Sequence, residues 1–87
     1  MIIGGNVDQI TSLHTHFNRN SDNVEALRAE LRGYVNDTDW NGAAANRFRE
    51  DWTTDFEPAL GRMEQALRSA AQEARRRADA LRAADQI

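Results

Sequence analysis

One apolar stripe runs through almost the whole chain with the spacing of an amphipathic helix. Its first part recurs every three or four residues, with one gap at Asn20, and comprises Ile10, Leu13, Phe17, Val24, Leu27, Leu31 and Tyr34. Its second part comprises Ala45, Phe48, Trp52, Phe56, Leu60, Met63, Leu67, Ala70, Ala74, Ala78 and Leu81. Steps of three and four place side chains on one side of an α-helix, whereas the strict alternation of a half-buried strand is not found. The stripe therefore predicts an all-α fold.

Few residues in the chain can end a helix. The one strong cluster of turn formers and N-cap residues is the run 36–42, Asn-Asp-Thr-Asp-Trp-Asn-Gly. This cluster predicts a single helical-hairpin domain over residues 1–87, with helices at about 7–36 and 43–83 and a turn at about 37–42. Asn6, followed by Gln9, has the pattern of a capping pair at the start of the first helix.

The only proline, Pro58, falls inside the second predicted helix. Steps of four from Phe48 to Leu60 slip by one residue against a strict heptad, and Pro58 lies within the slip. A proline in a helix interior costs about 3 kcal/mol, so one alternative is a kink near residue 58. The other alternative is a helix restart, in which Thr54 and Glu57 act as a capping box and Pro58 occupies the first turn.

Two antiparallel helices alone cannot enclose a core. The chain has 87 residues and no cysteine, so neither size nor disulfides stabilise a lone hairpin. We therefore expect it to dimerise into a four-helix bundle. The expected dimer interface consists of Leu13, Phe17, Val24, Leu27, Leu31, Phe48, Trp52, Phe56, Leu60, Met63 and Leu67.

The turn carries a Trp-x-Gly motif, Trp40-Asn41-Gly42, followed at helical spacing by Phe48 and Trp52. A motif of this kind between two long amphipathic helices resembles the WxG family, the small early-secreted-antigen-like proteins of type VII (ESX) secretion systems. The resemblance covers about residues 10–81. It implies a helical hairpin that forms a four-helix bundle with a second copy or a homologous hairpin and is exported folded, from the cytoplasm, without a cleaved signal peptide.

The resemblance also implies a composite export signal, made of the Trp-x-Gly turn of one subunit and a Tyr-x-x-x-Asp/Glu motif near the C-terminus of its partner. This chain departs from that pattern, because its only tyrosine is Tyr34, in the first helix. Leu81 and Asp85 keep the spacing and the acid but lack the ring. Two alternatives follow: a partner supplies the tyrosine, or Leu81 and Asp85 form a degenerate motif and a homodimer suffices.

Catalytic and cofactor sites are not indicated. The sequence holds no nucleophile and base pair, no phosphate-binding loop and no metal-ligand spacing, so we expect no enzyme, no cofactor and no metal. His14 and His16 are two residues apart and point to different sides of a helix. The formal charge of −3 argues against nucleic acid as a partner. The arginines at 75–77 are interpreted as a solvated helix face.

Three functional classes remain. The leading one is a WxG-type secretion substrate or co-secretion partner that contacts the type VII machinery. The alternatives are a membrane-active or pore-forming helical assembly, suggested by the amphipathic stripes, and an intracellular coiled-coil adaptor, favoured by the missing tyrosine. The sequence does not indicate membrane contact, because no apolar run approaches the roughly 20 residues of a membrane-spanning helix.

Overall fold

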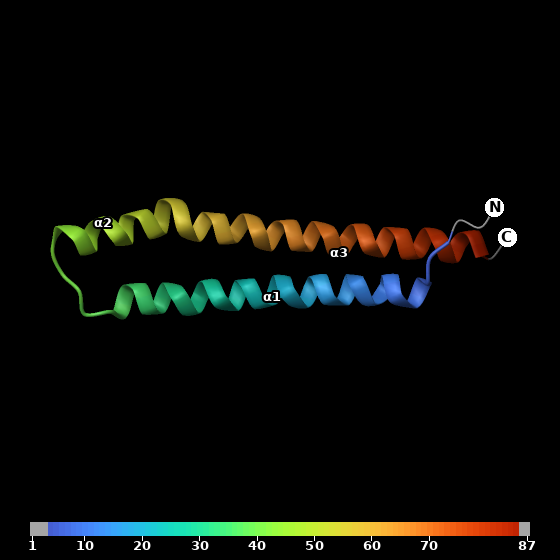
Figure 1. Cartoon of the computed structure of the whole chain (residues 1–87), viewed down its shortest axis with the longest axis horizontal. Helices are drawn as coiled ribbons and strands as arrows, with labels where there is room; N and C mark the ends of the chain where they lie inside the picture. The colour runs from blue at the N-terminus through green and yellow to red at the C-terminus, as the bar shows by residue number, and fades with distance from the viewer. Residues whose placement is uncertain (1–3, 86–87) are drawn as a thin grey trace.

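The fold is an antiparallel helical hairpin. The computed structural model describes residues 4–85, whose first arm is helix α1 (Val7–Asp37). The second arm comprises α2 (Ala43–Asp51), the π-helical turn η1 (Trp52–Phe56) and α3 (Glu57–Asp85), which follow one another without a break (Figure 1). The described residues contain no strand, and the predicted all-α hairpin is confirmed.

Polar groups define the two ends of α1. At its start, the Asn6 side-chain oxygen accepts a hydrogen bond of 3.1 Å from the backbone N–H of Gln9, as the capping pattern predicts. At its end, Thr38 leaves the helical conformation, and its backbone N–H donates to the Tyr34 carbonyl. The chain then crosses to α2, which extends beyond the end of α1 (Figure 1).

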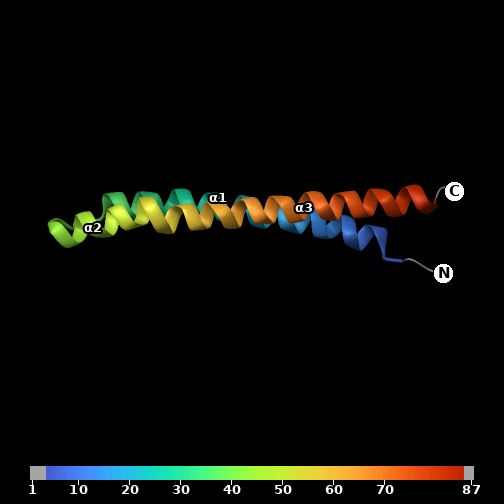
Figure 2. The ribbon, with the colours of Figure 1, turned by 90° about the horizontal axis from the view of Figure 1, so that it is seen from above.

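The molecule is a rod one helix layer thick. Its Cα atoms span 67 × 16 × 14 Å with a radius of gyration of 19.6 Å. A compact domain of this length would have a radius of about 12 Å. Seen from above, the second arm lies over the first along most of its length (Figure 2). Such a layer has no interior, so each arm has one side against its neighbour and the rest open.

None of the helices within residues 4–85 combines the length and the hydropathy of a membrane-spanning segment.

Small side chains fill the seam between the arms. Ser21, Ala71 and Ala78 are fully buried, and no larger side chain among the described residues is. The Ser21 hydroxyl donates a hydrogen bond of 3.2 Å to the Glu64 carbonyl. Small residues let two helices approach closely. The buried Ser21 hydroxyl has its hydrogen-bond partner within the seam, so its burial does not leave it unpaired. Asn20, which interrupts the sequence stripe, is exposed.

An ionic cluster lies at the middle of the seam. Glu64 is only 7% exposed, and its carboxylate accepts a hydrogen bond of 3.0 Å from the Arg28 guanidinium of the opposite arm. The Arg28 guanidinium lies 3.3 Å from the position that a Cβ on Gly61 would occupy. Gly61 therefore leaves room for the guanidinium, which also lies 3.7 Å from Glu57. This cluster pairs specific residues of the two arms and so fixes their register.

The π turn accounts for the proline and for the slip in the stripe. The backbone N–H of Glu57 donates to the Trp52 carbonyl, five residues earlier, so the helix continues to Pro58 and does not restart. The Thr54 hydroxyl donates to the Glu50 carbonyl at 2.9 Å instead of accepting a capping bond. A π turn takes up one extra residue. The missing N–H of Pro58 therefore lies next to a segment that is already widened.

Candidate functional site

The turn between the arms depends on Gly42. Its φ of 107° and ψ of −176° lie in a region that is essentially restricted to glycine. No heavy atom lies within 4 Å of the position that a Cβ would occupy, so the requirement is for the backbone angle and not for space. Gly42 is the N-cap residue of α2, and its carbonyl accepts from the Asn46 N–H at 3.0 Å. The motif glycine thus directs the chain into the second arm.

Trp40 begins a row of half-exposed aromatic rings. Its ring centroid lies 5.6 Å from that of Phe48, and Phe48 lies 6.3 Å from Phe56. The three side chains are 42%, 42% and 50% exposed. Tilted contacts at these distances are favourable for aromatic rings. Trp40 is therefore packed on one side and open to a partner on the other.

The π turn keeps this row straight. Phe48 and Phe56 are eight residues apart, which in a regular α-helix would rotate them by about 80°. Because η1 takes up one residue, the spacing is equivalent to seven residues of a regular α-helix, which places both residues on the same side of the arm and brings their rings into contact. Met63 follows seven residues later and is 53% exposed. The slip noticed in the sequence is thus the feature that aligns the aromatic row with the rest of the stripe.

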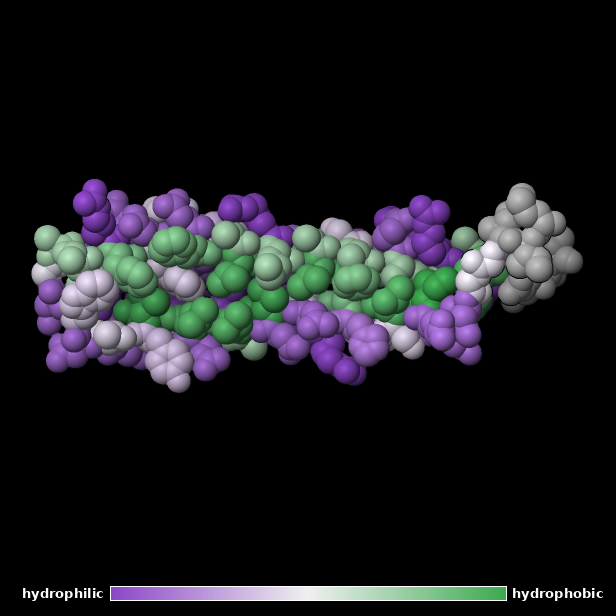
Figure 3. Space-filling model, in the orientation of Figure 1, coloured by the Kyte–Doolittle hydropathy of each residue, from purple (hydrophilic) through white to green (hydrophobic). Residues whose placement is uncertain are grey.

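An apolar face runs along the rod. Figure 3 shows apolar side chains gathered on one side over both arms, bordered by hydrophilic ones. Within residues 4–85, seven large hydrophobic side chains are exposed, of which Tyr34 is the most exposed, at 64%. We use "open face" for the other six, which are Leu13, Leu27, Trp40, Phe48, Phe56 and Met63. Exposed apolar side chains that lie together in this way mark interaction surfaces.

The predicted interface residues divide into three groups by exposure. Those that are exposed belong to the open face: Leu13, Leu27, Phe48, Phe56 and Met63. Those that are half-buried lie toward the neighbouring arm: Phe17, Val24, Leu31, Leu60 and Leu67. Trp52 is buried, at 8% exposure, within the single hairpin.

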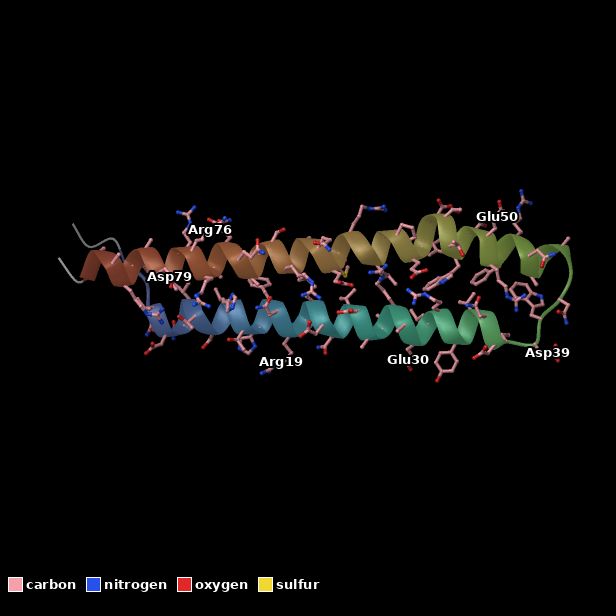
Figure 4. All side chains as sticks on the ribbon, turned by 180° about the vertical axis from the view of Figure 1, so that it is seen from behind. Arg19, Glu30, Asp39, Glu50, Arg76 and Asp79 are labelled. Carbon is pink, nitrogen blue, oxygen red and sulfur yellow. The ribbon has the colours of Figure 1, made fainter. Side chains whose placement is uncertain are left out.

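Acidic side chains near the turn are not neutralised. Within residues 4–85, no ion pair involves Asp37, Asp39, Glu50, Asp51 or Asp55. Figure 4 shows Asp39 on the connecting loop and Glu50 pointing away from α1. Arg47 also forms no ion pair within the described part, so this end of the rod carries net negative charge next to its aromatic row.

Farther along the rod, carboxylates are paired. A hydrogen bond from Arg32, together with the charges of Arg32 and Arg28, holds the pKa of the Glu57 carboxyl below its usual value, against a smaller opposing effect of burial. Hydrogen bonds from Arg76 and Arg77 lower the pKa of Glu73 in the same way. The pairs of Glu57 join the two arms, whereas those of Glu73 lie within α3.

The degenerate C-terminal motif lies at the opposite end of the rod from the turn. Leu81 is half-buried, and its methyl group lies 3.5 Å from the Cβ position of Gly5, close to Ile10. Asp85 is the last residue of α3, and its side chain lies outside the described part of the structure. Leu81 therefore packs against the start of α1 within its own hairpin.

His14 has a structural role that sequence spacing did not predict. Its Nδ1 lies 2.8 Å from the Ala71 carbonyl of the opposite arm, and because a carbonyl only accepts, Nδ1 is the protonated nitrogen. Asn18 donates to Nε2 at 3.2 Å. No group of three or more His, Cys, Asp or Glu side chains in residues 4–85 is arranged to hold a metal ion.

Arg49 is a second residue that the sequence pattern did not single out. Its guanidinium donates to backbone carbonyls at the end of α1 and in the turn. No spacing rule identifies such a residue, because its acceptors are backbone atoms 9 to 14 positions away.

Comparison with known proteins agrees with the position of the turn motif. A family model described as proteins of 100 residues with WXG matches residues 3–86. The match covers both arms and contains Trp40 and Gly42 at the bend. Comparison with curated proteins and comparison with solved structures each give no match.

Proposed function

The chain belongs to the WXG100 family, and from this premise we propose that it is a non-enzymatic interaction protein of a type VII secretion system. In this proposal the hairpin pairs with a second hairpin to form a four-helix bundle, and the pair is exported folded from the cytoplasm without a cleaved signal peptide. The observation that carries the proposal is the open face. Leu13, Phe56 and Met63 are 49%, 50% and 53% exposed in the single chain.

The geometry of the open face favours a helical partner. Leu13 and Leu27 are two heptads apart, and Phe56 and Met63 are one heptad apart. This repeat suits side chains that interdigitate with another pair of helices at a small crossing angle. Burying apolar surface contributes about 25 cal/mol per Å², and a hairpin without an interior has few other sources of stability. The partner is a second copy of this chain or a homologous hairpin.

The turn and the partner together make the proposed export signal. This chain contributes Trp40, half-exposed on the open face, and Gly42, which sets the bend. Leu81 packs within its own hairpin, which supports a partner as the source of the Tyr-x-x-x-Asp/Glu motif. We therefore propose export as a heterodimer with a tyrosine-bearing relative.

Sedimentation of the purified chain, alone and mixed with candidate homologous hairpins, tests the pairing. We expect a dimer that Met63→Glu dissociates, because a carboxylate on the open face would be buried without a partner. Gln65→Glu, at an exposed position two residues away, is the matched control and should leave the dimer intact. A stable, cooperatively unfolding monomer that pairs with none of the hairpins would contradict the proposal.

Export is tested in a type VII-competent host that lacks all related genes, by comparing culture filtrate with cell lysate. We expect the chain to remain in the cell until a tyrosine-bearing relative is added. Trp40→Ala should then abolish export with helicity retained, whereas Tyr34→Ala, at another exposed aromatic residue, should not. Efficient export of the chain alone, lost in Leu81→Ala, would instead establish the degenerate motif and a homodimer.

A further inference from the structure

Arg49 connects the second arm to the turn through three backbone carbonyls. Its Nε donates to the Val35 carbonyl at 3.0 Å, Nη1 to that of Trp40 at 2.8 Å and Nη2 to that of Thr38 at 2.8 Å. The five N–H donors of a guanidinium have a fixed planar arrangement, so one side chain can bridge several acceptors. Arg49 thereby joins α2 to the last turn of α1 and to the motif tryptophan.

The end of α1 needs such a donor. The last four carbonyls of a helix have no partners within the helix, and they carry the negative end of its dipole. The last turn of α1 contains no basic residue. Arg49 supplies both the hydrogen bonds and the positive charge from the other arm, and Val35 is one of the residues whose carbonyl it reaches.

Other contacts leave the turn loosely held. Asn41 donates to the Asp39 carboxylate at 3.3 Å within the turn, and Thr38 donates back to Tyr34. Neither contact reaches α2. The stacking of Trp40 on Phe48 does reach α2, but two rings in contact can slide, whereas hydrogen bonds at 2.8 Å fix the backbone that carries the ring.

Arg49 makes these bonds although acids lie nearby in the sequence. Glu50 and Asp51 follow it directly, and yet no ion pair of Arg49 is present among the described side chains. Because its donors bind backbone carbonyls, the Arg49 guanidinium holds the loop in one conformation and does not serve as a partner for these acids.

We propose that Arg49 is a positioning residue of the Trp40–Gly42 turn: it fixes the backbone at Trp40 so that the indole is presented in one orientation at the end of the open face. The effect of Arg49 on the indole is independent of secretion. Its consequence for export rests on the proposed function.

The test uses the full chain labelled with 5-fluorotryptophan and followed by ¹⁹F NMR. Trp40→Phe assigns the two signals, and the buried Trp52 reports on the fold. In Arg49→Gln we expect the Trp40 signal to broaden and its chemical shift to move toward that of a fully solvent-exposed 5-fluorotryptophan. The Trp52 signal should be retained. Arg49→Lys should behave like Arg49→Gln, because one ammonium group cannot span three carbonyls. Arg47→Gln, which removes an equal charge from α2, is the control and should change neither signal.

Export of the same variants, paired as in the assay above, gives the second measurement. We expect Arg49→Gln and Arg49→Lys to lose export while Arg47→Gln keeps it. An unchanged Trp40 signal in Arg49→Gln would overturn the proposal even if Trp40→Ala blocks export, and the proposed function would stand. If Arg49→Gln disturbs the Trp40 signal but the Trp40→Ala variant is fully exported, the role of the turn in export is rejected and the positioning role of Arg49 stands. Loss of both tryptophan signals in every Arg49 variant would make Arg49 a general stability residue and overturn the proposal.

Discussion

The half of the hairpin that holds the termini and the half next to the turn keep their helices together in different ways. In the terminal half (residues 7–28 and 57–85), fully buried Ser21, Ala71 and Ala78 let the arms approach closely, and charged groups are paired across the seam. In the turn half (residues 29–56), Ala45 and Trp52 are buried, but the rings of Trp40, Phe48 and Phe56 form a row from the turn along the second arm and remain half-exposed.

This difference concerns the seam between the arms and not the open face. Close packing of small residues leaves the seam of the terminal half little freedom, while Leu13, Leu27 and Met63 of the same half stay exposed on the open face. The turn half keeps large apolar area accessible, with Phe48 and Phe56 held in a row by the π turn. It also keeps several acids without ion pairs, so charge and apolar surface occur together at one end of the rod. The two halves meet at Arg28 and Glu57, where the ionic cluster fixes the register of the two arms.

The largest expected effect of a single change is in the close-packed seam. Ala71→Leu adds three carbon atoms where no space is available and should lower the free energy of unfolding by about 3 kcal/mol. Urea unfolding at one fixed protein concentration measures this. Ala66→Leu, at an exposed position of the same helix, is the control, and its effect should stay within about 0.5 kcal/mol. Equal effects of the two substitutions would show that the terminal half is not packed as described.

A smaller effect is expected at the turn. Gly42→Ala should lower the free energy of unfolding by about 2 kcal/mol, because an L-residue is strained at φ 107° while its methyl group meets no other atom. Semi-synthesis with D-alanine at the same position is the control: a D-residue favours positive φ, so stability should return to that of the natural chain. A D-alanine variant as unstable as the L-alanine variant would show that space, and not the backbone angle, is limiting.

The smallest effect is an acid dependence at the junction of the halves. Because the folded pKa of Glu57 lies below its unfolded value, the folded state binds fewer protons there, and the stabilisation is present above the ordinary glutamate pKa of about 4.3. It is lost as the pH falls through the folded pKa. Unfolding measured at neutral and at acid pH should therefore show a smaller difference in Glu57→Gln than in the natural chain.

Glu30→Gln is the control for this measurement, since Glu30 is exposed and forms no ion pair within residues 4–85. A pH dependence that Glu57→Gln leaves unchanged would assign the acid sensitivity to other carboxylates, such as Glu73 in the terminal half.

Local signals in the sequence were sufficient to predict the two helical arms and the turn between them. The three-and-four spacing predicted two helices, the Asn6 cap predicted the start of the first, and the cluster ending at Gly42 predicted the turn. Each of these depends on interactions over a few residues, and such interactions are readable from the order of the residues. The slip between Phe48 and Leu60 was also visible in the sequence. The continuous helix excludes the restart, but the sequence does not show that a π turn absorbs the extra residue.

Contacts between the arms were decided only by the tertiary structure. Sequence alone could not assign Trp52 to the interior of the hairpin and Met63 to its open face, because both belong to the same stripe. Nor could it find Arg49, whose acceptors are backbone carbonyls that come within reach only when the chain has folded back. The helical period fixes which side of a helix is apolar, but which part of that side meets the other arm depends on register and close approach. Those are set by small residues and paired charges from distant parts of the chain.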